Sequence, residues 1–98
     1  MRRAAKTDTN HATIRDGLRA VFGVDAVQDV SMYPRLGFDL IALVRGRVWF
    51  LEVKPPRRPT RLTASEQDAR RRYGDYWHVV TALDEALTVV ATEKEAIP

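Results

Sequence analysis

The chain has 98 residues, of which 45% are hydrophobic and 30% are charged. This length suits one domain and excludes a second, and the composition is that of a globular chain without the roughly 20-residue apolar run of a membrane span. The lack of cysteine excludes disulfides and zinc–thiolate sites, and without a signal-peptide core we expect a cytoplasmic protein. The net charge is +3 and the pI about 9.7, and clustered arginines favour a polyanionic partner.

A basic arm and a helix are expected at the start of the chain. Residues 1–7 are basic and show no periodicity, which predicts a mobile arm. Capping residues then precede apolar residues at helical spacing, so we expect a helix from about Asn10 to Phe22. Its inward residues are Ile14, Leu18, Val21 and Phe22. Arg15 and Arg19 should point outward, and Asn10 is either a helix cap or a neighbour of the acidic residues later in the chain.

A strand and a turn follow this helix. Apolar and polar residues alternate from Val24 to Met32 with one interruption, which predicts the first strand. Residues 33–37 contain a proline, which fixes φ, and a glycine, which allows a positive φ, and they predict a turn. The turn leads directly towards Asp39 and should set its position. A plain connector is an equal interpretation of the same residues.

Two apolar runs on either side of Arg45-Gly46 predict a β-hairpin. The runs cover residues 38–44 and 47–53, and the first contains only one charged residue, Asp39. Such a pattern suits strands that are covered on both faces. A buried acid on one of these strands therefore needs a partner.

The length of the hairpin loop decides which residue faces Asp39. If Arg45-Gly46 is a two-residue loop, Asp39 lies across from Glu52. A three-residue loop with a left-handed glycine would place Asp39 opposite Leu51 instead. The sequence leaves both registers open.

Lys54 follows Glu52 by two residues and therefore lies on the same face of its strand. Two carboxylates and one ammonium would then share one place. Paired carboxylates suit a hard cation such as Mg²⁺ or Mn²⁺, and the lysine could steady a developing negative charge or a water nucleophile. The plainer alternative is that Glu52 and Lys54 form a solvated strand edge and that Asp39 only marks the strand entry.

A stiff basic loop is expected after Lys54. Three prolines between residues 55 and 61 remove backbone donors and prevent the sheet from continuing. The loop also carries Arg57, Arg58 and Arg61, which could attract phosphate towards an otherwise repulsive acidic cluster. The alternative is a solvated surface loop.

The pattern Thr63-Ala64-Ser65-Glu66 is a capping box and predicts a second helix from about Ala64 to Tyr73 that ends at Gly74. Residues 70–72 are arginines in its last turn, where the helix dipole favours cations, so DNA contact is a secondary role for them. Gln67 lies one turn after Thr63 and is, on the pattern alone, as consistent with a plain exposed glutamine as with a site residue.

A strand and a helix complete the predicted domain. Tyr76–Val80 is aromatic and β-branched and predicts a final strand, on which His78 is a surface residue. A helix is expected from about Leu83 to Ala91, followed by a frayed tail at 93–98. Its inward residues are Ala86, Leu87 and Val90. The expected fold is a single α/β domain over residues 1–98, with element order α-β-β-β-α-β-α and a mixed sheet flanked by helices.

Parts of this pattern resemble a known nuclease family. Asp39, twelve intervening residues and then Glu52-Val53-Lys54 is similar to the D…(D/E)xK signature of the PD-(D/E)xK nucleases. More narrowly, residues 37–40, 51–54 and 62–67 resemble small stand-alone VRR-NUC (virus-type replication-repair nuclease) domains. The similarity extends from about Asp8 to Leu87.

The resemblance implies a PD-(D/E)xK nuclease-like fold and a metal-dependent DNA endonuclease, selective for Holliday junctions or other branched DNA. It implies that Asp39, Glu52 and the Val53 carbonyl bind Mg²⁺ or Mn²⁺. Lys54 would orient or activate the attacking water, with Gln67 as its support. A homodimer in the cytoplasm of a bacterium or phage-infected host is also implied, because junction-cutting relatives cut two strands symmetrically.

The chain departs from the family pattern at two places. Phe38 stands where the family often has proline, and no Glu occurs between Met1 and Val30, where the family often has one in its first helix. Either Asn10 or Asp16 takes that role, or the metal has one protein ligand fewer. The alternative function is therefore a non-catalytic DNA-binding or assembly subunit that keeps the nuclease fold.

Overall fold

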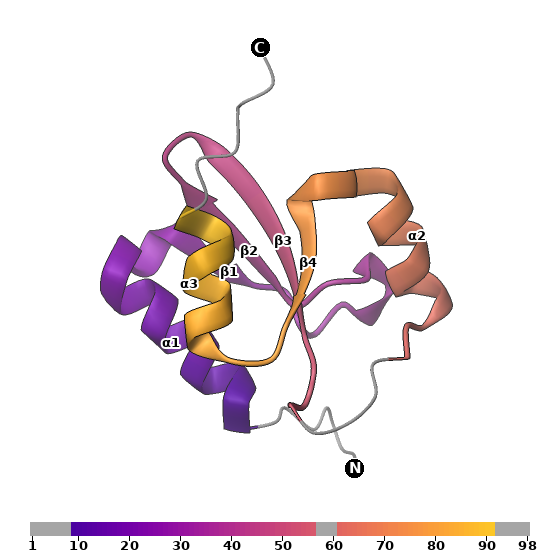
Figure 1. Ribbon diagram of the computed structural model, residues 1–98, viewed down its shortest axis with the longest axis horizontal. Coiled ribbons are helices and arrows are strands. Elements are labelled where there is room, and N and C mark those ends of the chain that lie inside the picture. Colours follow the sequence, from indigo (N-terminus) through magenta and orange to yellow (C-terminus); the bar gives the residue numbers. More distant parts are fainter. Residues whose placement is uncertain (1–8, 57–60, 92–98) are drawn as a thin grey trace.

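A four-stranded mixed sheet lies between two helical layers (Figure 1). The computed structural model describes residues 9–56 and 61–91. The strand order is β1-β2-β3-β4, with β1–β2 and β2–β3 antiparallel and β3–β4 parallel. Helices α1 and α3 lie on one side of the sheet and α2 on the other. The bounds are α1 Thr9–Phe22, β1 Val27–Asp29, β2 Leu40–Val44, β3 Arg47–Val53, α2 Ala64–Tyr73, β4 Trp77–Val80 and α3 Leu83–Ala91.

Three short 3-10 turns separate some of these elements, and the expected order did not contain them. They are η1 (Val24–Ala26), η2 (Pro34–Leu36) and η3 (Gly74–Tyr76). The first of them corrects the predicted first strand, because Val24–Ala26 is a turn and only Val27–Asp29 pairs with β2. The strand ends early because Asp29 accepts hydrogen bonds from the backbone and hydroxyl of Ser31 (3.0 and 2.7 Å), which turns the chain.

The hairpin between β2 and β3 has the two-residue loop. Val44 pairs with Arg47 and Leu40 with Leu51, which excludes the three-residue alternative. Both loop residues have positive φ, 54° at Arg45 and 78° at Gly46, as the tight turn between twisted strands requires. Regular pairing of β2 with β3 ends at Leu40, so Asp39, the residue before Leu40 in the chain, lies just outside the ladder.

The larger core lies between the sheet and helices α1 and α3. Its most deeply buried residues include Trp49, Ile14, Leu18, Leu40 and Leu51. A smaller cluster on the opposite face consists of Phe38, Ala69 and Trp77 with partly buried neighbours from β3 and α2. Because α2 covers this face only in part, Leu43 is 49% exposed, and the prediction that both hairpin strands are covered on both faces was wrong.

Helix α1 differs from its prediction in the direction of several side chains. Val21 was expected to point inward but is 60% exposed. Arg15 and Arg19 were expected to point outward, yet Arg15 reaches the Asp29 carboxylate (3.1 Å) and Arg19 donates to the Val27 carbonyl (3.0 Å). The short strand β1 leaves these acceptors at the surface, so the long arginine side chains fold back over it.

The predicted second and last helices are confirmed. The Thr63 hydroxyl accepts from the Glu66 N–H (3.1 Å), and the Glu66 carboxylate accepts from the Thr63 N–H (2.9 Å), so both bonds of the capping box form. Helix α3 spans the expected residues and buries Ala86 and Val90. Within the described ranges, no helix is long and apolar enough to cross a membrane. The basic arm at 1–7, the loop arginines Arg57 and Arg58, and the tail at 93–98 lie outside the described residues.

Gly37, in the turn before Asp39, packs closely against helix α2, and its replacement should lower the stability of the protein. Its φ is 84°, and a Cβ added there would collide with the Ser65 carbonyl and lie 2.8 Å from Ala69 Cβ. We expect Gly37→Ala to lower the free energy of unfolding by more than about 2 kcal/mol, from left-handed strain plus overpacking. Gly46→Ala is the matched control, because Gly46 also has positive φ but nothing within 4 Å, so it should cost only about 1 kcal/mol. Urea unfolding of both variants checks this, and equal losses would contradict it.

Candidate active site

The end of strand β3 meets the beginnings of helices α1 and α2. Asn10, near the start of α1, donates its side-chain amide to the carbonyls of Lys54 (3.0 Å) and Thr81 (3.2 Å). The structure therefore places Asn10 beside the candidate site. It is a residue of α1, and its side chain holds the Lys54 carbonyl in place. Glu66, in the first turn of α2, approaches the same lysine through its side chain.

Asp39 is anchored at the point where the hairpin ladder ends. Its N–H donates to the Leu51 carbonyl and its carbonyl accepts from the Val30 N–H (both 2.8 Å). Its carboxylate accepts from the Val53 N–H (2.9 Å), so a side chain takes over where a backbone pair with Glu52 would otherwise form. Burial raises the pKa of Asp39 above its usual value against the opposing effect of the Val53 N–H, and the negative charge of Glu66 adds to the increase.

Glu52 is a buried acid, with 6% of its surface exposed. Burial raises its pKa to about 9, and the nearby charge of Asp39 and the hydrogen bond and charge of Glu66 act in the same direction. Without a bound cation, Glu52 therefore holds a proton at neutral pH. The ionised form of the Glu52 carboxyl is therefore strongly disfavoured at this position.

Lys54 lies between two acids. Its Nζ is 2.9 and 3.0 Å from the two carboxylate oxygens of Glu66 and 3.4 Å from Glu52 Oε2. Burial lowers the pKa of Lys54, but the hydrogen bond to Glu66 and the charges of both acids outweigh burial and raise it. Burial likewise raises the pKa of Glu66, but hydrogen bonds from Glu52, the Thr63 N–H and Lys54 lower it overall. Lys54 is thus a fixed ammonium.

Glu66, and not Gln67, is the α2 residue beside Lys54. The Gln67 amide donates to the Leu62 carbonyl (3.2 Å) and its side chain is exposed. Sequence reasoning assigned Glu66 only to the capping box. The signal for its second role is that a capping-box glutamate has a free edge of its carboxylate, which can receive a second cationic donor.

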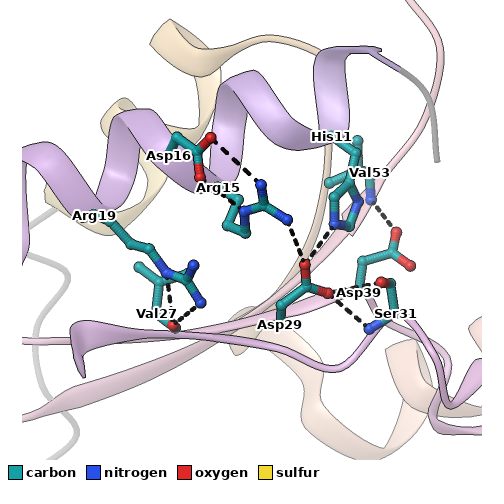
Figure 2. A network of polar contacts seen from close by, with 9 residues as sticks. All are labelled: His11, Arg15, Asp16, Arg19, Val27, Asp29, Ser31, Asp39 and Val53. Atoms are coloured by element: carbon teal, nitrogen blue, oxygen red, sulfur yellow. Dashed lines mark hydrogen bonds and ion pairs between the residues drawn. The ribbon is translucent and has the colours of Figure 1, made fainter. Parts of the chain in front are cut away.

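A second polar network joins α1 to β1 next to this cluster (Figure 2). His11 is 3% exposed, and its Nε2 lies 3.1 Å from Asp29 Oδ2, which also accepts from Arg15. These bonds contribute to a lowered Asp29 pKa although burial acts in the opposite direction. His11 also lies close enough to Asp39 to contribute to lowering the Asp39 pKa against the effect of burial. The sequence contained one signal for this residue, since His11 precedes Arg15 by four positions on a single helix face.

Asp39, Glu52 and the Val53 carbonyl form a sparse set of oxygen donors. Within residues 9–56 and 61–91, no group of three or more His, Cys, Asp or Glu side chains is arranged to hold a metal ion. Two carboxylates still fit Mg²⁺, which is commonly held by one or two carboxylates together with waters and substrate phosphate oxygens. The raised pKa values of Asp39 and Glu52 support this fit, because a cation would relieve the cost of ionising both.

The structure brings together most of the predicted site. Asp39, Glu52, Lys54 and Asn10 gather at one end of the sheet, whereas Gln67 faces away from Lys54 and Arg61 lies beside α2. Asp16, the other candidate for the missing helix-one acid, forms an exposed ion pair with Arg15. Comparisons with protein-family models, curated proteins and solved structures found no match. The resemblance to VRR-NUC domains therefore stays a prediction from the motif.

Proposed function

We propose that the protein is a Mg²⁺- or Mn²⁺-dependent endonuclease that hydrolyses DNA phosphodiester bonds. The observation that supports this most is the contact of the half-buried Lys54 with the buried acids Glu52 and Glu66 beside the anchored Asp39. Asp39 and Glu52 both have pKa values raised by burial, an arrangement that costs stability without a cation and is typical of functional sites. The hairpin between helices on both sides of the sheet is consistent with a PD-(D/E)xK nuclease-like fold.

Each residue has a separate task in this proposal. The Val53 N–H holds the Asp39 carboxylate. Asp39, Glu52 after loss of its proton to solvent, and the Val53 carbonyl would hold the metal ion. A bound Mg²⁺ or Mn²⁺ would polarise the phosphate and acidify a bound water. Lys54 stays protonated because Glu66 holds it, so it stabilises negative charge and orients water instead of acting as a base. Gln67 is left with a supporting role near the substrate.

Arginines attract the substrate that the acidic cluster repels. Arg61 follows the loop containing Arg57 and Arg58, and contacts to DNA phosphates set affinity through counterion release. We also infer a homodimer that acts on junction or branched DNA, because a two-fold dimer presents two sites at a fixed spacing. The second candidate function is a DNA-binding or assembly subunit without turnover, made plausible by the lack of a glutamate between Met1 and Val30.

One experiment separates the two functions. Labelled four-way junction, fork and linear DNA are incubated with Mg²⁺, with Mn²⁺ or with EDTA. We expect cleavage by the wild-type protein only with a metal ion, and none by Asp39→Asn, which keeps an acceptor for the Val53 N–H but loses the charge. Metal-free binding by this variant should be equal or tighter, because a repulsive charge is removed. Binding of all substrates without any metal-dependent cleavage would favour the non-catalytic subunit.

A further inference from the structure

A groove with several arginines runs along α2 towards strand β4. Its first part is a hollow of about 570 Å³, lined by Arg61, Leu62, Gln67, Arg70 and Arg71. A second hollow of about 580 Å³ shares Leu62 and Arg70 and continues to Trp77, His78 and Val79 on strand β4. The two hollows, called the α2 groove below, lead from the first turn of α2 to strand β4 at the edge of the sheet.

The α2 groove carries an excess of positive charge. Within residues 9–56 and 61–91, Arg61 and Arg70 form no ion pair. Arg71 shares Asp68 with Arg72 (2.7 and 3.0 Å), and Asp75 is the only acid among the described lining residues. Exposed arginines without acidic partners that line one hollow favour an anion with several phosphate groups.

The floor of the α2 groove is apolar. Leu62 and Val79 are partly buried and pack against the cluster of Phe38, Ala69 and Trp77. Trp77, a member of this cluster, also lines the second hollow, whereas His78 alternates to the other face of β4, where its ring packs against Trp49 (5.7 Å between ring centroids). A cationic rim over an apolar and aromatic floor matches single-stranded nucleic acid, which offers phosphates and unpaired bases together, whereas a duplex offers mainly phosphates.

We propose that the α2 groove binds a single-stranded segment of DNA, with phosphates on Arg61 and Arg70 and bases over Leu62, Trp77 and Val79. Only the relation of the strand to the cleaved bond rests on the proposed function: Gln67 and Glu66 are neighbours in the first turn of α2, so the groove begins at the same end of α2 as Lys54, although the two side chains face different ways. The substrate class that follows is DNA with an unpaired tail or flap beside the cleaved bond.

The test is metal-free binding measured by fluorescence anisotropy. Labelled oligothymidylate and a blunt duplex are titrated in EDTA with the wild-type protein and with Arg61→Gln/Arg70→Gln. The matched control is Arg47→Gln/Arg72→Gln, which removes the same charge from the hairpin tip and from the α2 residue that pairs with Asp68. Melting curves check folding, and exposed substitutions of this kind should change stability by less than about 0.5 kcal/mol.

We expect the groove variant to bind oligothymidylate at least about tenfold more weakly than the control variant, with a salt slope smaller by about 1.4 for two lost phosphate contacts. Its binding to the blunt duplex should differ little from that of the control. Equal affinities of the two variants for the single strand, or equal losses on both DNAs, would overturn the assignment. Because EDTA prevents turnover, a failure of the proposed nuclease activity would appear only in the cleavage assay and leave this result intact.

Discussion

Replacing Glu52 with Gln should stabilise the metal-free protein at pH 8 while abolishing its metal-dependent activity. In the folded protein the pKa of Glu52 is raised to about 9, from an ordinary value of 4.5. A group with a raised folded pKa contributes stability that is complete below pH 4.5 and is lost as the pH rises towards 9. Gln keeps the shape and the donor of the protonated acid without its ionisation. The gain at pH 8 should be on the order of a few kcal/mol.

Urea unfolding in EDTA between pH 5 and 9 measures this effect. The difference between Glu52→Gln and the wild type should be small at pH 5 and increase steadily towards pH 9. Glu66→Gln is the matched contrast, because the pKa of Glu66 is lowered and its carboxylate holds both Lys54 and the Thr63 N–H. It should therefore destabilise the protein at pH 8. Parallel pH profiles for the wild type and Glu52→Gln would refute the expectation.

Metal ions should reverse the order of stability of the wild-type protein and Glu52→Gln at pH 8. A cation that binds only the folded state raises stability in proportion to the logarithm of its concentration. Mn²⁺ added at pH 8 should therefore raise the unfolding midpoint of the wild type and leave that of Glu52→Gln nearly unchanged. A similar shift in both proteins would place the metal elsewhere.

The hairpin and the capped helices could be predicted because their signals are local. Arg45-Gly46 between apolar runs, and the capping box from Thr63 to Glu66, each specify their structure within a few residues. The first strand could not be delimited in this way. It depends on Asp29, whose side chain bonds to Ser31, His11 and Arg15 and whose partners come from two elements. Alternation alone carries no information on such a competing acceptor.

The site was predicted in its composition but not in its contacts. Asp39, Glu52 and Lys54 come together at the end of the two-residue hairpin, but the ladder stops at Leu40, and Asp39 bonds to Leu51 and Val53 instead of pairing with Glu52. Which α2 residue faces Lys54 depends on about 100° of helix rotation, the difference between Glu66 and Gln67, and only the docking of α2 on the sheet decides that. His11 was missed because its partner Asp29 lies on another element.

Lys54→Met should remove both the catalytic ammonium and the charge that holds two acids together. Met keeps most of the apolar stem, so the change is mainly electrostatic. Glu66 would lose contacts of 2.9 and 3.0 Å, and Glu52 one of 3.4 Å. We expect metal-dependent cleavage to fall by roughly 10²–10⁴-fold. Stability at pH 8 should fall by about 3 kcal/mol, the low end for a broken buried ion pair because Lys54 keeps some solvent access.

Two further variants separate these effects. Lys54→Arg restores a cation for Glu66 and should recover most of the stability, but its larger planar group should not recover cleavage. Lys54→Met/Glu66→Gln removes both members of the pair, so a double-mutant cycle should give a favourable coupling of about 1–3 kcal/mol in unfolding. Cleavage by this double variant should stay as low as that of Lys54→Met, because its stability is regained without the ammonium. Cleavage by Lys54→Met at the wild-type rate would show that Lys54 is only a structural partner of Glu66 and would remove it from the catalytic set.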